Sequence, residues 1–355
     1  MQNFQPDYRN FLAVMNNRRP ARLPLYEHLV NGASIFKLVN GRELPDRYHS
    51  PGAADLKDFA HDYCQFWKRL TYDTISIESS IGGFLPDSGA IMGGRPGPIQ
   101  CRADFEAYPW DEVPVRYWQA STPIFDALRD ALPPGMKFVG GVGNGVFEIS
   151  ENLVGLEYLP FIEADDPELY TELHDKIGWL MTTIWTEFLK RYSDIFVACR
   201  FGDDLGFRSS TLTSPSTIRN HIIPQYKKVI DLVHAAGNKF LYHSCGCIFE
   251  VMDDMIAAGI DAKHSNEDGI APFQRWIDDY GSRIGFCGGF DMDFICRKTE
   301  RDVYESALEL GRQYRRTARG YALGSGNSIP EYVPTENYLA MIEAAKAIRR
   351  EEGNG

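Results

Sequence analysis

The chain has 355 residues, 44% of them hydrophobic, which is enough for one large domain or two ordinary ones. Its formal net charge of −12 argues against a nucleic-acid surface. No apolar run approaches the roughly 18 residues of a membrane span, no apolar leader opens the sequence, and the seven cysteines are an odd number. We therefore expect a reduced, cytoplasmic, globular protein.

The first third of the chain mixes periodic segments with long irregular ones. Residues 3–17 predict an N-terminal amphipathic helix, because polar residues and a proline close an apolar stripe. The stretch 30–52 is rich in Gly and Pro and predicts an irregular surface segment. Residues 82–116 contain many turn formers and predict a loop-rich insertion after the second strand.

Eight short apolar runs have the length of buried strands, and they are residues 22–27, 73–78, 137–142, 195–200, 239–243, 260–264, 284–287 and 321–324. Helical spacing predicts helices at 55–70, 122–132, 167–192, 214–236, 248–258, 270–280, 299–318 and 335–350. Continuous apolar runs are typical of parallel strands that are buried on both faces. The pattern predicts a (β/α)8 TIM barrel, a single domain over residues 1–355. A doubly wound sheet would alternate in the same way, but no Gly-rich dinucleotide motif follows the first strand.

Polar side chains gather where the predicted strands end. In a (β/α)8 barrel the chemistry lies at the carboxyl ends of the strands. Each of these residues alone could cap a helix or close a turn, whereas their accumulation at one face predicts a site. They are Glu27, His28, Glu78, Asn144, Glu148, Asp203, Asp204, His243, Cys245, His264, Glu267, Cys287, Asp291, Ser325 and Asn327.

The most pointed of these features is the strand that ends on His243 and Cys245. Side chains at i and i+2 of an extended chain leave the same face, so the imidazole and the thiol project together. Both are ligands that zinc prefers. The alternative is a packed core thiol beside a histidine that is bonded to a backbone carbonyl. The adjacent carboxylates of Asp203 and Asp204, which lie between two glycines, could hold a histidine, a metal or a substrate amine, or could cap the following loop.

Several motifs together resemble the uroporphyrinogen decarboxylase superfamily, and in particular its branch of corrinoid-dependent methyltransferases. The resemblance runs from about Asn16 to Lys346. Its motifs are Gly202-Asp-Asp-Leu-Gly206, Ser214-Pro-Ser-Thr-Ile-Arg, Ile223-Pro-Gln-Tyr-Lys227, His243-Ser-Cys-Gly246, Gly288-Gly-Phe-Asp291, Asn327-Ser-Ile-Pro and Val333-Pro-Thr-Glu-Asn337.

The resemblance implies a (β/α)8 barrel and a methyl transfer between a small methylated substrate and a corrinoid (cobalamin) that a partner protein carries. Its thiol-methylating members hold zinc with His-x-Cys and a later Cys. His243 and Cys245 match the first two ligands, and Asn327 stands where the third is expected. A completed zinc site then needs another ligand, with Glu267 as our expectation and Cys287, Glu78 or His264 as alternatives.

Members that demethylate oxygen or nitrogen must deliver a proton to the leaving atom. The resemblance thus implies catalytic roles for Asp203, Asp204, Glu78, Glu148 and Asn327. It also implies substrate-binding roles for a second set, which comprises Glu27, His28, Asn144, Cys287 and Asp291.

Two other functions remain open. A carboxy-lyase acting on a tetrapyrrole would need cations in the cleft, and only Arg200, Arg208 and Lys263 lie near strand ends. The segment Leu25-Tyr-Glu-His-Leu-Val-Asn lacks the arginine pair with which the decarboxylases grip carboxylates, and Glu78 replaces their aspartate. The third reading is a noncatalytic barrel that binds a small molecule. A homodimer is one option for the assembly.

Overall fold

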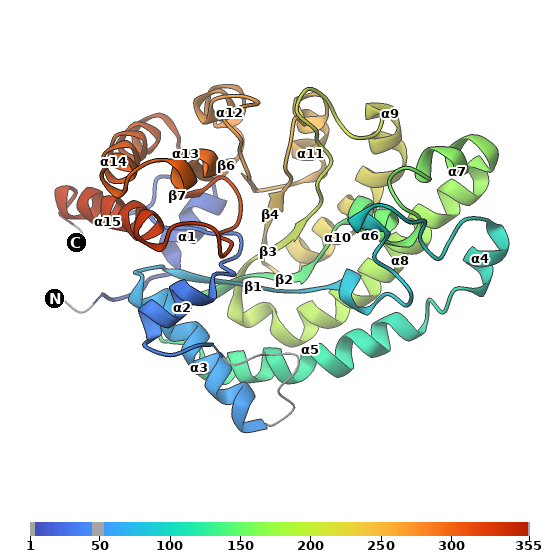
Figure 1. Ribbon diagram of the computed structural model, residues 1–355, viewed down its shortest axis with the longest axis horizontal. Coiled ribbons are helices and arrows are strands. Elements are labelled where there is room, and N and C mark those ends of the chain that lie inside the picture. The colour runs from blue at the N-terminus through green and yellow to red at the C-terminus, as the bar shows by residue number, and fades with distance from the viewer. Residues whose placement is uncertain (1–3, 45–52, 354–355) are drawn as a thin grey trace.

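A single parallel sheet organises the protein (Figure 1). The computed structural model describes residues 4–44 and 53–353, and within them seven strands follow one another in the order of the chain. They are β1 (Thr74–Ser80), β2 (Lys137–Gly143), β3 (Phe196–Gly202), β4 (Lys239–His243), β5 (Ala262–His264), β6 (Gly285–Phe290) and β7 (Tyr321–Ser325). Because every neighbouring pair is parallel, all carboxyl ends lie at the same edge.

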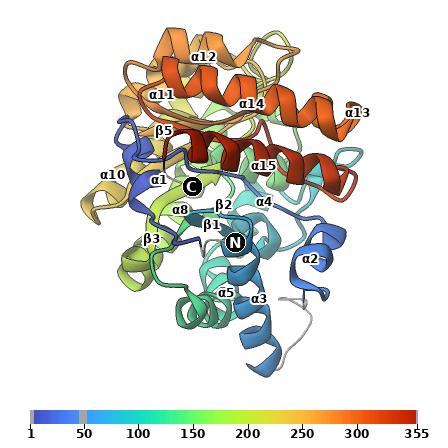
Figure 2. The same ribbon diagram turned by 90° about the vertical axis from the view of Figure 1, so that its left-hand side faces the viewer.

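Helices cover the outer side of this curled sheet, as the end-on view shows (Figure 2). The α-helices are α1 (Arg9–Met15), α2 (Ala33–Asn40), α3 (Ala53–Arg69), α4 (Arg102–Ala107), α5 (Glu112–Ala131), α6 (Val146–Leu153), α7 (Leu159–Asp165), α8 (Pro167–Tyr192), α9 (Pro215–Thr217), α10 (Ile223–Ala235), α11 (Met252–Ala258), α12 (Phe273–Tyr280), α13 (Met292–Arg297), α14 (Glu300–Thr317) and α15 (Thr335–Glu351). Short 3-10 turns are η1 (Ile81–Phe84), η2 (Ala90–Met92), η3 (Ser193–Ile195) and η5 (Phe249–Val251), and η4 (Ile218–Ile222) is a π-helical turn. None of the described helices is both long and apolar enough to cross a membrane.

The fold is α/β and resembles a TIM barrel, although the predicted eighth strand is not confirmed. Residues 22–27 make only an isolated bridge, in which Leu25 pairs with Leu323 of β7. Its backbone bonds run from Tyr26 N to Leu323 O and from Leu323 N to Pro24 O, at 2.9 and 3.0 Å. The segment is short and contains Pro24, which has no backbone N–H to donate, so it does not form a continuous ladder. It nevertheless places Glu27 and His28 beside the carboxyl end of β7.

Several predicted boundaries are wrong for identifiable reasons. The helix predicted at 3–17 begins at Arg9, and the first residue of that prediction lies outside the described ones. The helix predicted at 122–132 begins at Glu112, because Pro123 resembles a first-turn proline but lies inside α5. Among the described residues, five helices were not predicted, namely α2, α4, α6, α7 and α13, and α4 lies inside the stretch predicted as a loop-rich insertion. All five have only six to eight residues, which is too short for a periodic pattern to stand out.

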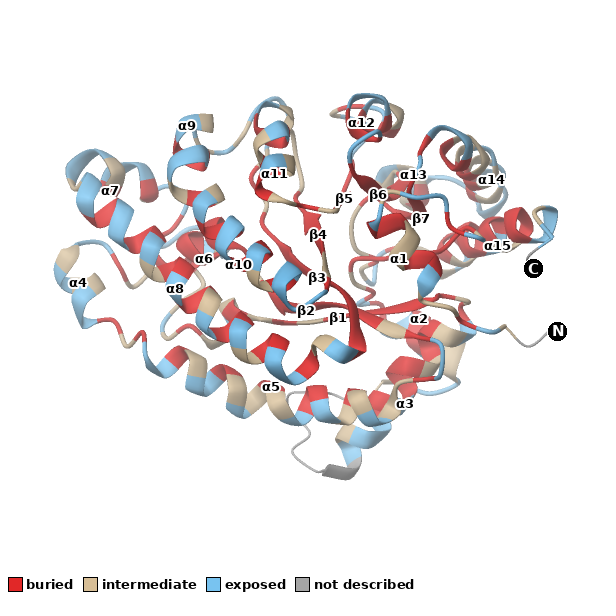
Figure 3. Cartoon of the chain, turned by 180° about the vertical axis from the view of Figure 1, so that it is seen from behind, coloured by how far each residue is buried: buried red, intermediate tan, exposed pale blue. Residues whose placement is uncertain are grey.

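The two ends of the sheet differ sharply in polarity. Toward the amino ends of the strands, an apolar layer of Val139, Ala198, Leu241, Ala262 and Cys287 packs under Phe11 and Val14 of α1. The strands are buried on both sides, whereas the outer faces of the helices are exposed (Figure 3). The polar side chains lie instead at the carboxyl ends of the strands, which is where the candidate site is.

Candidate functional site

Two neighbouring strands bring the predicted histidine and thiol together with an aspartate. Gly202, the last residue of β3, pairs in register with His243, the last residue of β4. The two loops that follow stay in contact, because the Cys245 backbone N–H donates to Asp204 Oδ1 at 2.8 Å. Gly246 turns the chain with φ +79°, and a Cβ there would lie 2.1 Å from the backbone oxygen of Gly206. Only glycine fits at this point.

Asp204, His243 and Cys245 form a group that suits a metal ion. Their donor atoms all lie within 4.8 Å of one another. His243 Nε2 is 3.6 Å from Cys245 Sγ and 3.8 Å from Asp204 Oδ1. Four ligands at tetrahedral angles and ordinary zinc bond lengths lie about 3.4–3.6 Å apart. One nitrogen, one sulfur and one oxygen at these distances therefore fit zinc with a fourth position left open. We call these three residues the metal group.

A second triad, which contains His28, His243 and His264, suits a metal less well although its nitrogens also lie within 4.8 Å. The His28 and His243 rings stack, with centroids 3.8 Å apart and planes 21° apart. Ring lone pairs lie in the ring planes, so stacked rings do not direct them at a common ion. His243 Nδ1 and His264 Nδ1 are 2.8 Å apart, which is a hydrogen bond.

The three imidazoles are buried and uncharged. Burial and, second to it, the charge of nearby groups lower the pKa of His243 well below its usual range, and burial lowers that of His264 to about 3. His28 shows the same direction, because of burial and then Arg200. The Nδ1 atom of His28 is buried without a hydrogen-bond partner among the described residues.

Two donors surround the sulfur of Cys245. Asn327 Nδ2 donates to Sγ at 3.3 Å, and Ser265 Oγ lies 3.5 Å from Sγ. Burial, followed by the charge of Asp204, raises the pKa of the thiol, so a cation is needed to make it a thiolate. Asn327 thus lies beside the sulfur as the resemblance implied. Glu267 instead accepts a bond from the Gly246 backbone N–H at 3.3 Å and is not part of the metal group.

Asp203 points the other way, toward the start of α6. It accepts hydrogen bonds from the backbone N–H groups of Phe147 and Glu148 at 2.8 and 2.7 Å, and a third from the Tyr226 hydroxyl. These amides are the second and third of α6, which have no partner within a helix. A Cβ on Gly145 would lie 2.3 Å from Asp203, so glycine is required there. Burial raises the pKa of Asp203 to about 7, against the pull of its three donors.

Helix α6 carries two carboxyl groups whose pKa values are raised. Burial and the nearby aspartates raise the pKa of Glu148 well above its usual range and that of Glu151 to about 8. Asn144, which has φ +66°, donates to Glu148 Oε2 at 2.7 Å. The raised pKa favours the protonated form of both carboxyl groups. Glu151 was missed in the sequence. The signal was its spacing of three residues from Glu148, which becomes visible only once α6 is recognised.

Glu78 is held by a buried cation. Its Oε2 accepts from Arg200 Nη2 at 2.7 Å, and Arg200 Nη1 bonds the Tyr26 hydroxyl at 2.7 Å and the His28 carbonyl at 3.0 Å. Arg200 is fully buried on β3 and was considered in the sequence only as a lyase cation. It instead ties β1 to the segment that carries His28.

The remaining candidates make bonds or contacts that support the scaffold, and one of them, Asp291, also lines the hollow described below. Glu27 is fully buried and accepts from the Ser325 backbone N–H at 3.0 Å and from its hydroxyl, and burial raises the pKa of Glu27 to about 8. Asp291 caps α13 by accepting from Phe294 N at 3.0 Å. Cys287 packs in the apolar layer near α1 and is not brought to the cluster. It is inward-facing, but it lies below the level of the polar strand ends.

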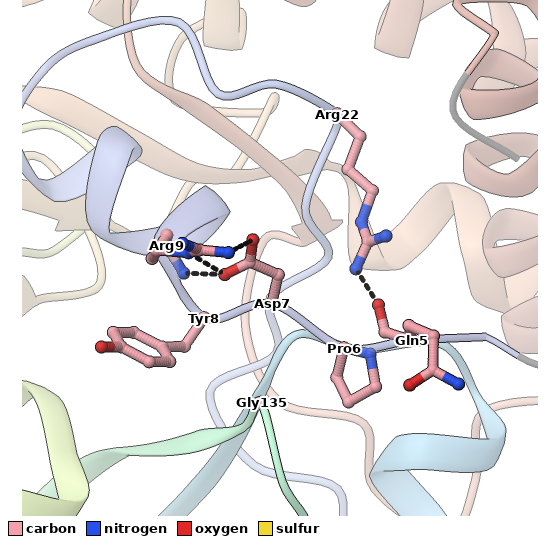
Figure 4. A pocket seen from close by; sticks show the side chains of 7 residues that line it. All are labelled: Gln5, Pro6, Asp7, Tyr8, Arg9, Arg22 and Gly135. Atoms are coloured by element: carbon pink, nitrogen blue, oxygen red, sulfur yellow. Dashed lines mark hydrogen bonds and ion pairs between the residues drawn. The ribbon is translucent and has the colours of Figure 1, made fainter.

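A hollow of about 560 Å³ opens beside the metal group. Asn327, which contacts the Cys245 sulfur, lines it together with Glu267 and Asp291. A second hollow of about 550 Å³ is lined by Arg9 and Arg22 (Figure 4). Their guanidinium groups are already paired with Asp7 and Asp73, so we place the site at the first.

A family model described as uroporphyrinogen decarboxylase (URO-D) matches residues 96–348. The chain belongs to this family. The match includes the metal group and α6, and it ends just before the end of α15. A search of curated proteins finds no match.

One solved structure shows a similar backbone arrangement at low identity. A methyltransferase from Methanosarcina mazei is 16% identical, with a TM-score of 0.68 over 95% of this chain and 97% of that one. Weaker similarity is found to a family 5 glycoside hydrolase from Prevotella bryantii, at 8% identity and TM-score 0.45 over 94% and 97% of the chains. A xylanase from Penicillium canescens gives 10% identity and TM-score 0.40 over 90% and 98%. The first likeness establishes the fold of this URO-D family member.

Proposed function

We propose that this URO-D family member is a methyltransferase that exchanges a methyl group between a small methylated substrate and a corrinoid on a partner protein. The observation that carries the proposal is the metal group, in which Asp204, His243 and Cys245 offer three donors within 4.8 Å at the carboxyl ends of the strands. The structural likeness to the Methanosarcina methyltransferase supports the same reading.

The metal group fits zinc, which when bound would act as a Lewis acid on a substrate heteroatom. Asp204, His243 and Cys245 would hold it, and Asn327 and Ser265 would direct their donors at the sulfur. These hydrogen bonds withdraw electron density from the sulfur. We propose that the site activates an oxygen or nitrogen of a methylated substrate, because an amide replaces the second thiolate of the thiol-methylating members.

A leaving heteroatom keeps the electron pair of the methyl bond, so it needs a proton. We assign this role to Glu148 and Glu151, because the raised pKa of each carboxyl group favours its protonated form. Asn144 orients Glu148 through the 2.7 Å bond to Oε2. Asp203 holds the first turn of α6 and so positions both acids, although it does not itself face the metal group.

The bonding of the buried Arg200 supports the proposed function over a decarboxylase. A carboxylated tetrapyrrole would need free cations in the cleft, and Arg200 is committed to Glu78, Tyr26 and the carbonyl of His28. Arg208 lines the hollow but is exposed. Release of carbon dioxide from uroporphyrinogen by the purified protein would reverse this preference.

Metal analysis of purified variants tests the metal group. Wild-type protein should hold about one zinc per chain, and Cys245→Ala and Asp204→Asn should lose it. Cys247→Ala is the matched control, because Cys247 is a half-buried neighbour outside the metal group. Equal metal content in all four proteins would contradict the assignment.

Methyl transfer is tested with reduced free corrinoid and a panel of methoxylated and methylated-amine compounds. Methylation of the cobalt changes the visible spectrum of the corrinoid, and the zinc-loaded wild type should produce this change with at least one compound. The Cys245→Ala variant should not. If the zinc-loaded protein leaves the corrinoid spectrum unchanged with every compound of the panel but binds another ligand, the result would favour a noncatalytic binding protein.

A further inference from the structure

A chain of hydrogen bonds runs inward from the metal group and ends on a backbone carbonyl. His264 Nε2 lies 2.9 Å from the carbonyl oxygen of Ser325. A carbonyl oxygen can only accept, so His264 must carry its hydrogen on Nε2 and donate it. The Nδ1 atom of a neutral His264 then has no hydrogen and is an acceptor.

The tautomer of His264 determines the tautomer of His243. Its Nδ1 lies 2.8 Å from His264 Nδ1, and two lone pairs at this distance would repel each other. His243 must therefore carry its hydrogen on Nδ1. Its Nε2 atom is left with a lone pair, and this is the atom that faces Cys245 Sγ at 3.6 Å and Asp204 Oδ1 at 3.8 Å.

Packing prevents either ring from turning to escape this arrangement. His264 is fully buried, and the edge of its ring meets Tyr26 at a centroid distance of 5.1 Å. The His243 ring lies against His28 in the stack described above. The two strands also hold the histidines side by side, because His243 and His264 are register partners of β4 and β5.

We propose that His264 is a positioning residue that, together with the Ser325 carbonyl, fixes His243 in the one tautomer able to bind a metal. This inference deepens the proposed function and rests on the metal group described there. An imidazole in the other tautomer would present an N–H to the ion and could not bind it. Fixing the tautomer in advance removes that competing state and orients the lone pair.

The tautomers can be measured directly in metal-free protein. The chain has eight histidines, so selective labelling of their ring nitrogens with nitrogen-15 and a long-range proton–nitrogen correlation spectrum should resolve them. His243→Gln and His264→Gln assign the two rings. We expect a protonated Nδ1 on His243 and a protonated Nε2 on His264. A protonated Nε2 on His243 would overturn the proposal.

Zinc titration of variants tests the consequence. His264→Leu should weaken binding by about 10- to 100-fold. His264→Gln can both donate to Ser325 and accept from His243, and it should stay within about threefold of wild type. His174→Leu is the control, because His174 is a fully buried histidine bonded to the Tyr170 carbonyl at 2.8 Å on α8. Circular dichroism verifies that each variant is folded.

The outcomes separate this inference from the proposed function. Wild-type affinity in a folded His264→Leu protein overturns the positioning role, even if zinc binds and methyl transfer proceeds. If the spectrum shows the expected tautomers but wild-type protein takes up no zinc, the proposed metal group fails while the hydrogen-bond chain stands. If His264→Gln keeps the zinc affinity of the wild type and His264→Leu loses it, the result supports both the positioning role and the metal group.

Discussion

The same substitution by asparagine should affect different properties at the adjacent residues Asp203 and Asp204, namely stability at Asp203 and zinc affinity at Asp204. Asp203 is fully buried and accepts from two α6 amides and a tyrosine hydroxyl. Asparagine keeps one acceptor oxygen and puts an NH2 group where the other was, so at least one backbone N–H loses its partner. A buried donor left unpaired, here a first-turn amide of α6, costs about 1–3 kcal/mol. Asp203→Asn should therefore lower the free energy of unfolding by about 1–3 kcal/mol.

Asp204→Asn should leave stability within about 0.5 kcal/mol of wild type, as is usual for a partly exposed side chain. The Asp204 side chain is 44% exposed, and an asparagine oxygen can still accept from the Cys245 backbone N–H. The anionic member of the proposed metal group is lost, however, so zinc affinity should fall. Urea denaturation of the metal-free proteins, followed by circular dichroism, and zinc titration measure the two effects. Equal losses of stability in both variants would refute the division of roles.

Three further predictions concern an acid of α6, the sulfur of Cys245 and the glycine at position 246. Glu151 has a pKa raised to about 8 by burial, so between pH 4.5 and 8 the folded protein keeps a proton that the unfolded chain releases, and stability falls as pH rises. Glu151→Gln should thus gain up to about 4 kcal/mol relative to wild type between pH 5 and pH 8, and denaturation curves that shift equally at both pH values would count against it. Asn327→Cys, which puts a second thiol beside Cys245, should tighten zinc binding by about tenfold or more in competition with a chelator. Gly246→Ala requires a Cβ 2.1 Å from the Gly206 backbone oxygen, so it should cost about 2 kcal/mol or more and reduce zinc uptake, and unchanged values would refute the close packing of these loops.

The extent to which the site could be predicted from sequence depends on how local each signal is. The pairing of His243 with Cys245 follows from the two-residue period of a strand end, and the structure brings both side chains to the metal group. Strand β4 and helix α8 have the predicted bounds, 239–243 and 167–192. A turn that contains Gly237 precedes β4, and the N-cap Asp166 followed by Pro167 marks the start of α8.

Other features depend on contacts between distant segments. Asp204, rather than Glu267, joins the metal group because the β3 and β4 loops are hydrogen-bonded, and the Cys245–Asp204 contact spans 41 residues. Short helix α6 escaped detection, and with it the role of Glu151. The His243–His264 bond could not be foreseen either, since it requires the register between β4 and β5.

One dipeptide joins the two halves of the candidate site. Successive side chains after a strand leave opposite faces, so Asp203 reaches α6 while Asp204 reaches His243 and Cys245. Helix α6 and the metal group are therefore both attached to this one dipeptide. A shift of the β3 loop must move both together. Glycines permit close approach on two sides of this loop, at Gly145 against Asp203 and at Gly206 against Gly246, where a Cβ would fall within 2.5 Å of a neighbouring atom. The close packing that these glycines permit holds α6 and the proposed metal group against the same loop, as a reaction that uses a proton donor and a metal at one heteroatom would require.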